Sequence, residues 1–331
     1  MTAPGALMRS DTFRLHRFLA ATVLALPLAA AAQSYPSRPI NVILPYALGG
    51  TTDVLARMLQ DPLQKALGQP IVIEARTGAS GLIGTRYVAR SPADGYTLLF
   101  QTGAHVIVPH VSRNPGVDPL GDFEPVALVA SQPFVLVTHP SVPARTVKEF
   151  IDFVRANPGK IDYGSSGASS FGRLATEQFM RMAGIDMVHI PYKGMGPITT
   201  AMVTGEVKAM ISSTSPQVNQ FVKEGRLNLL GVASPEPSPL VPGVEPIART
   251  LPGYSAEVWF GFLAPKGTRL EIVTTLYRAI ERSVAQPDVK ARFESAGTGV
   301  ALLAPDAFRA RMQREHQAWG EIIRKLGISE D

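Results

Sequence analysis

"PYALGGTTD" (Pro45–Asp53) lies between an apolar segment, "INVIL", and a helix-like pattern, "VLARML". The first segment is typical of a buried strand, and the apolar residues of the second fall on one face of a helix. A strand, a glycine turn and a helix N-terminus together form an anion-binding arrangement, because the free backbone N–H groups of the first helical turn add to the helix dipole. The stretch therefore predicts an α/β fold with an anion site after the first strand.

The helix that follows this loop contains a proline. Leu55, Leu59 and Leu63 share one helix face, but Pro62 lies among them and removes a backbone hydrogen bond. We expect a kink or a restart at this point, with Asp61 capping a second short helix.

The rest of the chain alternates apolar, strand-like segments with amphipathic, helix-like segments. This alternation predicts an α/β protein with mostly parallel sheets, because parallel strands need helical crossover connections. Amphipathic helices are expected at 170–183, 268–286 and 305–326. After "INVILPY", which ends at Tyr46, strands are expected at 70–76, 96–102, 133–139, 186–192, 207–213 and 227–233.

Two irregular segments divide the chain into two lobes. Residues 138–150 pass through prolines to a helix that Thr146 is expected to cap, and residues 234–253 are rich in Pro and Gly. We interpret both segments as crossings between lobes, and we expect the C-terminal helices to pack on the first lobe. The predicted lobes are 33–137 with 256–331, and 138–255.

Composition excludes several classes of function. The chain has 331 residues, 45% of them hydrophobic, which is enough for two domains with large cores. It has no cysteine, which excludes disulfides, thiolate catalysis and cysteine metal sites. The sequence has no run of Lys and Arg with interleaved aromatic residues, so nucleic acid is not an expected partner.

Residues 1–32 have the pattern of a signal peptide. Three arginines precede the apolar stretch Phe18–Ala29, and Ala30 and Ala32 supply small residues before a cleavage site at Gln33. The apolar stretch is short for a bilayer span, so we expect export with cleavage near Ala32 rather than a membrane anchor. Cleavage removes three arginines and one aspartate and lowers the formal net charge from +5 to +3, a mild excess that suits an anionic ligand. Met8 offers an alternative start.

The loops after the strands are the candidate site, because open α/β sheets bind ligands at the carboxyl ends of their strands. These loops are rich in Gly, Ser and Thr, and "GGTTD" and "SSGASS" each lead into a helix, one in each lobe. Two helix N-termini facing each other across a cleft would hold a carboxylate through backbone N–H groups and hydroxyls. The candidate ligand-binding residues are Tyr46, Leu48, Gly49, Gly50, Thr51, Thr52, Asp53, Thr102, Gly103, His105, Ser165, Ser166, Ser169, Ser170, Phe171, Lys193 and Ser212.

Simpler interpretations of these residues stay open. The serines of "SSGASS" also suit helix caps and turns, and Asp53 would favour the helix dipole whatever the function. Lys193 also suits an exposed surface position, while His105 and His189 also suit structural roles.

The sequence offers little that would support catalysis. "ALGGTTD" lacks the Lys-Ser/Thr of a nucleotide-binding phosphate loop and the third glycine of a dinucleotide fingerprint. The histidines are scattered, so neither a metal nor a cofactor is expected. Ser165 or Ser166 paired with His189 or His105 leaves an exported serine hydrolase as an alternative. We favour a binding protein that is not an enzyme.

Several blocks of the sequence resemble one family. "YPSRPINVILPYALGGTTDVLAR" resembles the opening of the Bug-type extracytoplasmic solute-binding proteins, the receptors of the tripartite tricarboxylate transporters. The similarity covers essentially all of 35–327. Its further blocks, in order, are "LGQPIVIEARTGASGLIG", "PADGYTLLF", "DFEPVALVA", "NPGKIDYGSSG", "VHIPYKGMGP", "VWFGFLAPKGT" and the pair Trp319–Gly320.

The resemblance implies a two-lobed periplasmic binding protein of the Venus-flytrap, type II-like kind, with helices flanking the sheet of each lobe. It implies that a small carboxylate is held between the lobes, at Tyr46–Asp53 and Ser165–Ser170, without a cofactor. It also implies a periplasmic protein that delivers its ligand to the membrane permease subunits of a tripartite transporter, and we expect a monomer. A sensor component that presents the ligand to a receptor is the alternative.

Some residues depart from the family pattern. Ala47 and Leu48 replace two prolines, and Ser212 replaces an aspartate, which removes a negative charge from the predicted cleft. Phe171 stands where a small polar residue is common, and Arg173 where histidine is common. These departures favour an aromatic or medium-chain carboxylate if Phe171 faces the cleft; the alternative is that Phe171 points into the core of the second lobe.

Overall fold

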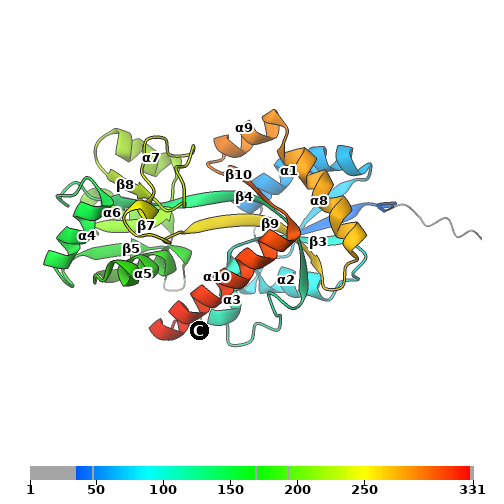
Figure 1. Cartoon of the computed structure of the whole chain (residues 1–331), viewed down its shortest axis with the longest axis horizontal. Coiled ribbons are helices and arrows are strands. Elements are labelled where there is room, and N and C mark those ends of the chain that lie inside the picture. The colour runs from blue at the N-terminus through cyan, green and yellow to red at the C-terminus, as the bar shows by residue number, and fades with distance from the viewer. Residues whose placement is uncertain (1–34, 47, 168–169, 193, 329–331) are drawn as a thin grey trace, which may run out of the picture.

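The computed structural model describes residues 35–328 except 47, 168–169 and 193. The predicted signal peptide and the candidate residues Ser169 and Lys193 lie outside the described residues. Figure 1 shows two lobes side by side, joined by two long strands that run between them. The two-lobed α/β architecture expected from the sequence is confirmed.

Within the described residues, ten strands form one continuous sheet that passes through both lobes. Its main path runs β2-β1-β3-β9-β4-β7-β5-β6. β10 pairs with the middle of β4, at Leu128–Ser131, and β8 pairs with its last residues, Val135–Thr138. The strands are β1 (Ile40–Leu44), β2 (Ile71–Ala75), β3 (Thr97–Thr102), β4 (Phe123–Thr138), β5 (Asp162–Ser165), β6 (Val188–Pro191), β7 (Ala209–Ser213), β8 (Asn228–Val232), β9 (Glu257–Pro265) and β10 (Gly299–Leu303).

Strand β4 changes partners along its length and so belongs to both lobes. Up to Pro133 it pairs with β9, and from Phe134 onward it pairs with β7 and β8. The outward crossing therefore lies inside a strand, and the chain returns just before Glu257, where β9 begins. The lobe limits at 137/138 and 255/256 stay predictions.

The sheet is mixed in a regular way. β1 pairs in parallel with β2 and β3, and β5 pairs in parallel with β6 and β7, as expected from the helical crossovers between them. β9 is antiparallel to both β3 and β4, and β4 is also antiparallel to β7, β8 and β10. The sheet is therefore mixed where a mostly parallel sheet was expected. One contribution is that β9, which returns to the first lobe, runs opposite to β4, which left it.

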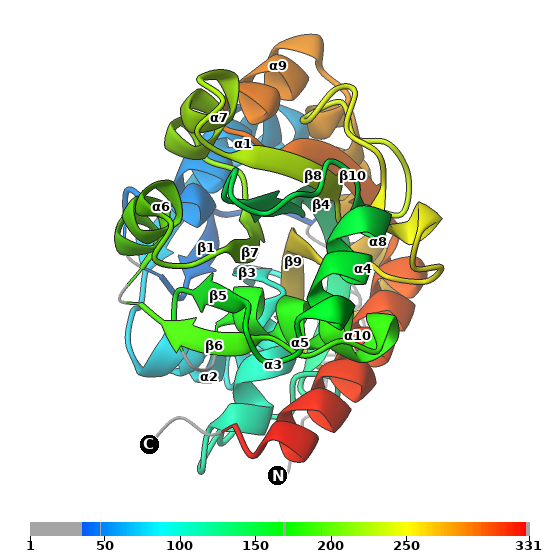
Figure 2. The ribbon, with the colours of Figure 1, turned by 90° about the vertical axis from the view of Figure 1, so that its left-hand side faces the viewer.

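Helices cover both faces of the sheet in each lobe. In the first lobe, α1, α8 and α9 pack on one face around Phe260 and Phe262, while α2, α3 and α10 pack on the other around Trp259 and Leu263. In the second lobe, α4 and α5 cover one face and α6 and α7 the other. Figure 2 shows this layering from the end of the second lobe. The helices are α1 (Thr51–Leu67), α2 (Leu82–Ala89), α3 (Ala104–Val111), α4 (Val147–Ala156), α5 (Phe171–Ala183), α6 (Met195–Thr204), α7 (Pro216–Lys223), α8 (Leu270–Val284), α9 (Pro287–Ser295) and α10 (Pro305–Leu326), with short 3₁₀ helices at Ala79–Gly81 and Ile247–Arg249.

Helix α1 corrects one expectation and α4 confirms another. α1 runs without a break from Thr51 to Leu67, so the predicted restart at Pro62 with a cap at Asp61 is wrong. Pro62 is buried, and the packing of this helix against the sheet outweighs the loss of one backbone hydrogen bond. Thr146 caps α4 as predicted, since its side chain accepts the backbone N–H of Glu149.

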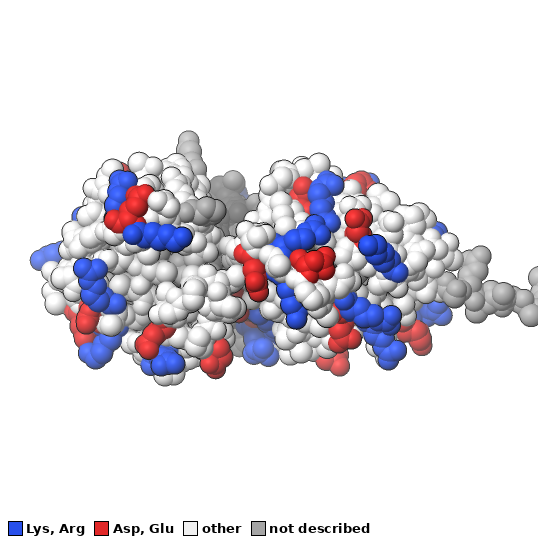
Figure 3. All heavy atoms as spheres, turned by 90° about the horizontal axis from the view of Figure 1, so that it is seen from above, with Lys and Arg blue, Asp and Glu red and all other residues white. Residues whose placement is uncertain are grey.

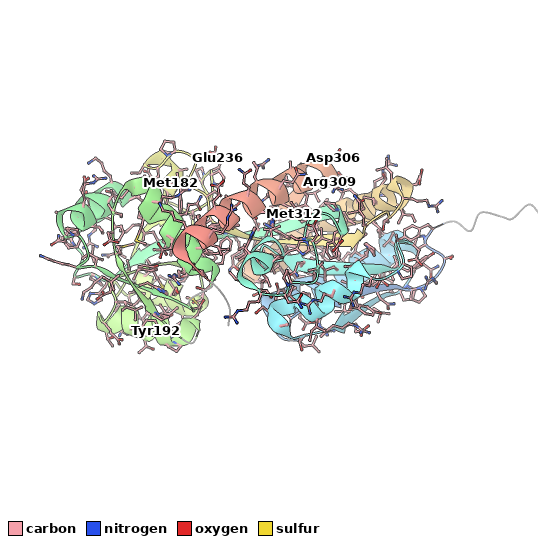
Figure 4. All side chains as sticks on the ribbon, turned by 90° about the horizontal axis from the view of Figure 1, so that it is seen from below. Met182, Tyr192, Glu236, Asp306, Arg309 and Met312 are labelled. Carbon is pink, nitrogen blue, oxygen red and sulfur yellow. The ribbon has the colours of Figure 1, made fainter. Side chains whose placement is uncertain are left out.

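Helix α10 connects the two lobes on one side of the molecule. Figure 4 shows it running from Asp306 past Arg309 and Met312 toward the second lobe. There the ring of Trp319 meets Phe171 of α5 edge to face, with centroids 5.0 Å apart.

The surface carries charges of both signs. In Figure 3, Lys and Arg side chains alternate with Asp and Glu side chains over both lobes of the face that is drawn. Within the described residues, none of the helices combines the length and the apolar character that a bilayer span requires.

Candidate functional site

The first glycine loop is held by the acid of its own helix. Gly50 is the N-cap of α1, and the helix start has no side-chain cap. Asp53 instead reaches back, accepting the Gly49 N–H at 2.9 Å and pairing with Arg57 at 2.8 Å. Asp53 is therefore committed to shaping the loop, and Arg57 balances its charge. Gly49 has φ +84°, a conformation that L side chains rarely adopt, which explains why a glycine stands here.

A hydrogen-bond network joins the ends of β1 and β3. The Tyr46 hydroxyl donates to Gln101 Oε1 at 2.6 Å and lies 3.1 Å from Thr102 Oγ1. The Thr102 backbone N–H also donates to Gln101 Oε1, at 2.9 Å. Burial raises the pKa of Tyr46 to about 12, so its phenol stays neutral and keeps its proton. The network fixes Tyr46 and Thr102 at the edge of the first lobe that faces the second.

The second-lobe loop is shaped by a serine and a histidine. The Ser165 hydroxyl donates to the Gly167 carbonyl at 2.8 Å and lies 2.7 Å from His189 Nε2. The Gly167 carbonyl can only accept, whereas His189 Nε2 donates to or accepts from Ser165 Oγ according to the tautomer of its ring. Burial and the nearby Arg173 lower the pKa of His189 to about 4, so the ring is neutral at pH 7.

The described contacts do not complete a hydrolase triad around this pair. The Ser165 hydroxyl lies within hydrogen-bond distance of the Gly167 carbonyl as well as of His189 Nε2. Within the described part of the chain, His189 also has no carboxylate hydrogen-bond partner to orient it. The hydrolase alternative is therefore not favoured by the geometry.

A pocket of about 260 Å³ lies between the lobes and gathers four of the candidate residues. Tyr46, Thr102 and Gly103 come from the first lobe, and Phe171, the first residue of α5, comes from the second. Ser170, the N-cap of α5, accepts the backbone N–H of Arg173 just beside it. The complete lining is Tyr46, Ser80, Thr102, Gly103, Ala104, Ile107, Val108, Val111, Phe171 and Val258.

Other candidates lie outside this lining. The α1 start, from Gly49 to Asp53, does not line the pocket, and Leu48 is 58% exposed. Ser166 is exposed, and Ser212 is buried in β7 opposite Val135 of β4. A direct role for these residues in ligand binding stays a prediction.

His105 is built into the core of the first lobe. Its Nε2 lies 2.8 Å from the Pro119 carbonyl, and its ring meets Phe123 edge to face. Burial lowers its pKa to about 4. These contacts give His105 a structural role, in which it holds α3 against the segment that precedes β4.

Six lining residues were not predicted as site residues. Four of them, Ala104, Ile107, Val108 and Val111, share one face of α3. The spacing of these four residues is the signal that identifies the face. Ser80 and Val258 lie on a turn and on a crossing strand, where only the fold brings them to the pocket.

Comparison with known proteins agrees with this architecture. The sequence profile of the family described as "Tripartite tricarboxylate transporter family receptor" matches residues 55–328. Protein BugT of Bordetella pertussis is 36% identical over 313 residues, which cover 94% of this chain and 95% of BugT.

Two solved structures share the fold. The periplasmic binding protein BugD is 30% identical, with a TM-score of 0.67 over 90% of this chain and 100% of BugD. A protein of R. palustris solved with adipate is 32% identical, with a TM-score of 0.70 over 89% of this chain and 99% of that protein. The resemblance noted in the sequence is confirmed, and the chain belongs to the family of receptors of the tripartite tricarboxylate transporters.

Proposed function

We propose that this protein is a periplasmic receptor that captures a small carboxylate in the pocket between its lobes. The observation that carries the proposal is the pocket itself, which residues of both lobes line and into which the first residue of α5 projects. A ligand that contacts both lobes stabilises the closed arrangement over an open one, because it gains contacts only when the lobes meet. The adipate-bound relative supports a carboxylate as the ligand class.

The chain reaches the periplasm, in this proposal, through cleavage of residues 1–32. The support is the sequence pattern of a basic region, an apolar stretch and small residues before Gln33. Mass spectrometry of the protein from a periplasmic extract tests this step. A mature chain beginning at Gln33 is expected, and a chain that retains the apolar stretch would contradict it.

Delivery of the ligand follows capture. The loaded, closed monomer would dock on the permease subunits of a tripartite transporter, as the family description supports. In this proposal the protein acts by binding and release rather than by catalysis, which its membership of a receptor family supports. Among the described residues, His189 also has no carboxylate hydrogen-bond partner of the kind that a hydrolase triad requires.

The experiment is a thermal-shift and calorimetric panel on residues 33–331 with mono-, di- and tricarboxylates. A ligand at 100 times its Kd adds about 2.7 kcal/mol to the free energy of unfolding, which raises the melting temperature visibly. Thr102→Val should weaken binding, because it removes the hydroxyl at the pocket. Thr200→Val is the matched control, since it removes the same hydroxyl at an exposed position of α6 outside the pocket lining, where Thr200 donates to the Gly196 carbonyl. A flat panel, or equal affinity losses in the two variants, would contradict the proposal.

A further inference from the structure

The pocket between the lobes changes character along its length. Its polar groups are Tyr46, Thr102 and Gly103, where β1 and β3 end, and Ser80 of the turn before α2. From there the lining follows helix α3, from Ala104 to Val111, over a rise of about 10 Å. Along that distance the helix presents only apolar side chains, which are spaced to fall on one face. A ligand with its carboxylate at the polar end therefore places its body against hydrocarbon.

Phe171 forms an aromatic wall of this apolar part. Its ring meets Phe134 of β4 and Trp319 of α10 edge to face, with both centroid distances 5.0 Å. Phe171 is thus fixed by two rings, one on a crossing strand and one on the other lobe. The ring packs against the core and also lines the pocket. A ring already held in place loses little freedom when a bound aromatic ring packs against it.

The charge pattern restricts the ligand further. Among the described residues, those that line the pocket are all uncharged. A second carboxylate at the far end of a ligand would lie against Ile107, Val108 and Val111 and would lose its hydration without gaining a cation. Burial of an unpaired charge is strongly unfavourable. The pocket therefore selects against dicarboxylates with carboxylates at both ends.

From these observations we infer that the ligand is an aromatic monocarboxylate of about the size of benzoate. The pocket of about 260 Å³ has room for a molecule of that size. This inference rests on the proposed function, since it names the ligand class of the same site. It separates this chain from its adipate-bound relative, whose ligand carries a carboxylate at each end.

Isothermal titration calorimetry on residues 33–331 with two matched pairs of acids tests the inference. Benzoate against terephthalate, and hexanoate against adipate, each differ by one distal carboxylate. We expect the monocarboxylate of each pair to bind at least tenfold more tightly, and benzoate to bind more tightly than hexanoate. Phe171→Leu should reduce the advantage of benzoate over hexanoate by about two- to tenfold, because it removes the aromatic wall but keeps the wall apolar.

A charge placed on α3 should reverse the selectivity. Val108 lies on the apolar wall, so Val108→Lys supplies a cation for a distal carboxylate, and we expect adipate and terephthalate to gain at least tenfold relative to their partners. Val108→Met has a side chain of similar reach without the charge, so a reversal of selectivity that Val108→Lys shows and Val108→Met does not is due to the charge. Circular dichroism establishes that each variant is folded.

The outcomes separate this inference from the proposed function. If adipate or terephthalate binds the parent protein more tightly than its monocarboxylate partner, the ligand class is wrong and the receptor function stands. If Val108→Lys is folded and leaves the selectivity unchanged, the α3 face does not contact the ligand and the inference is likewise wrong. If the folded protein binds no carboxylate, the proposed function itself fails.

Discussion

Asp53 shows how a single acid shapes the first glycine loop. It is 5% exposed, accepts the Gly49 N–H and pairs with Arg57. Asp53→Ala leaves that N–H without its partner, so we expect the free energy of unfolding to fall by about 1–3 kcal/mol in urea titrations at pH 7. Asp152→Ala is the control, because Asp152 pairs with Lys148 and Arg155 at the surface and should matter little. Equal effects at the two positions would contradict this role.

His105 links stability to pH. Burial lowers its folded-state pKa to about 4 from an ordinary value of 6.5, so between these values the unfolded chain binds a proton that the folded chain does not. Stability therefore falls as pH decreases from 6.5 to 4, by about 1.4 kcal/mol per pH unit at most for this group. His105→Gln should flatten the pH dependence by nearly one proton in urea titrations at pH 7, 6 and 5. An unchanged slope would mean that His105 is not the titrating group.

One substitution distinguishes a structural role of the Ser165–His189 pair from a catalytic role. Ser165→Ala removes the hydroxyl that connects His189 to the Gly167 carbonyl, so the second-lobe loop loses two hydrogen bonds. We expect carboxylate affinity to fall about two- to tenfold, which corresponds to one or two modest hydrogen bonds. Hydrolysis of p-nitrophenyl acetate should be the same for the parent and the variant. A rate that drops in Ser165→Ala would restore the hydrolase interpretation.

At the scale of elements, two helix caps of the same chemistry differ in their distance from the pocket. Ser170 caps α5 directly beside Phe171, and Thr146 caps α4 at a site outside the pocket lining. Replacing either with Ala should destabilise the fold by about 0.5–2 kcal/mol. Only Ser170→Ala should also weaken carboxylate binding, as calorimetry would show. Weaker binding in both variants would mean that the caps act through global stability alone.

The elements also show what sequence patterns can and cannot predict. Strands with a continuous buried apolar run, such as Val42–Leu44 of β1 and Leu98–Phe100 of β3, are predicted well, because burial on both faces leaves such a run in the sequence. β4 was predicted only in its last part, since Pro133 interrupts its pattern where the strand changes partners from β9 to β7. Pro62 led to the opposite error. It predicted a restart in a helix that is continuous, because the tertiary packing of α1 outweighs the effect of the proline.

The binding pocket was predicted only in part, for a related reason. Tyr46, Thr102, Gly103 and Phe171 follow strands or begin a helix, so their positions in the sequence mark them. The apolar face of α3 carries no polar signal, and its helix contains Pro109, so only the packed structure identifies it as a wall of the pocket. Polar ends of sites are visible in a single sequence, whereas apolar walls resemble core.

At the scale of the whole molecule, the lobes share a strand and should unfold together. β4 pairs with strands of both lobes within one continuous sheet, and Phe171 and Trp319 pack across the lobes. Differential scanning calorimetry should therefore show one transition whose calorimetric and van't Hoff enthalpies agree. Two resolved transitions would show that the lobes unfold independently in spite of the shared strand.

The position of β9 has a consequence for how the chain is made. β9 lies between β3 and β4 in the part of the sheet that belongs to the first lobe. In the sequence, however, it begins only at Glu257, after the segments that form the second lobe. During synthesis, the first lobe lacks this central strand until β9 has been made, and no earlier segment takes its place. For the export that we propose, this order of synthesis is useful, because a chain that folds late is still unfolded when it reaches the translocation machinery.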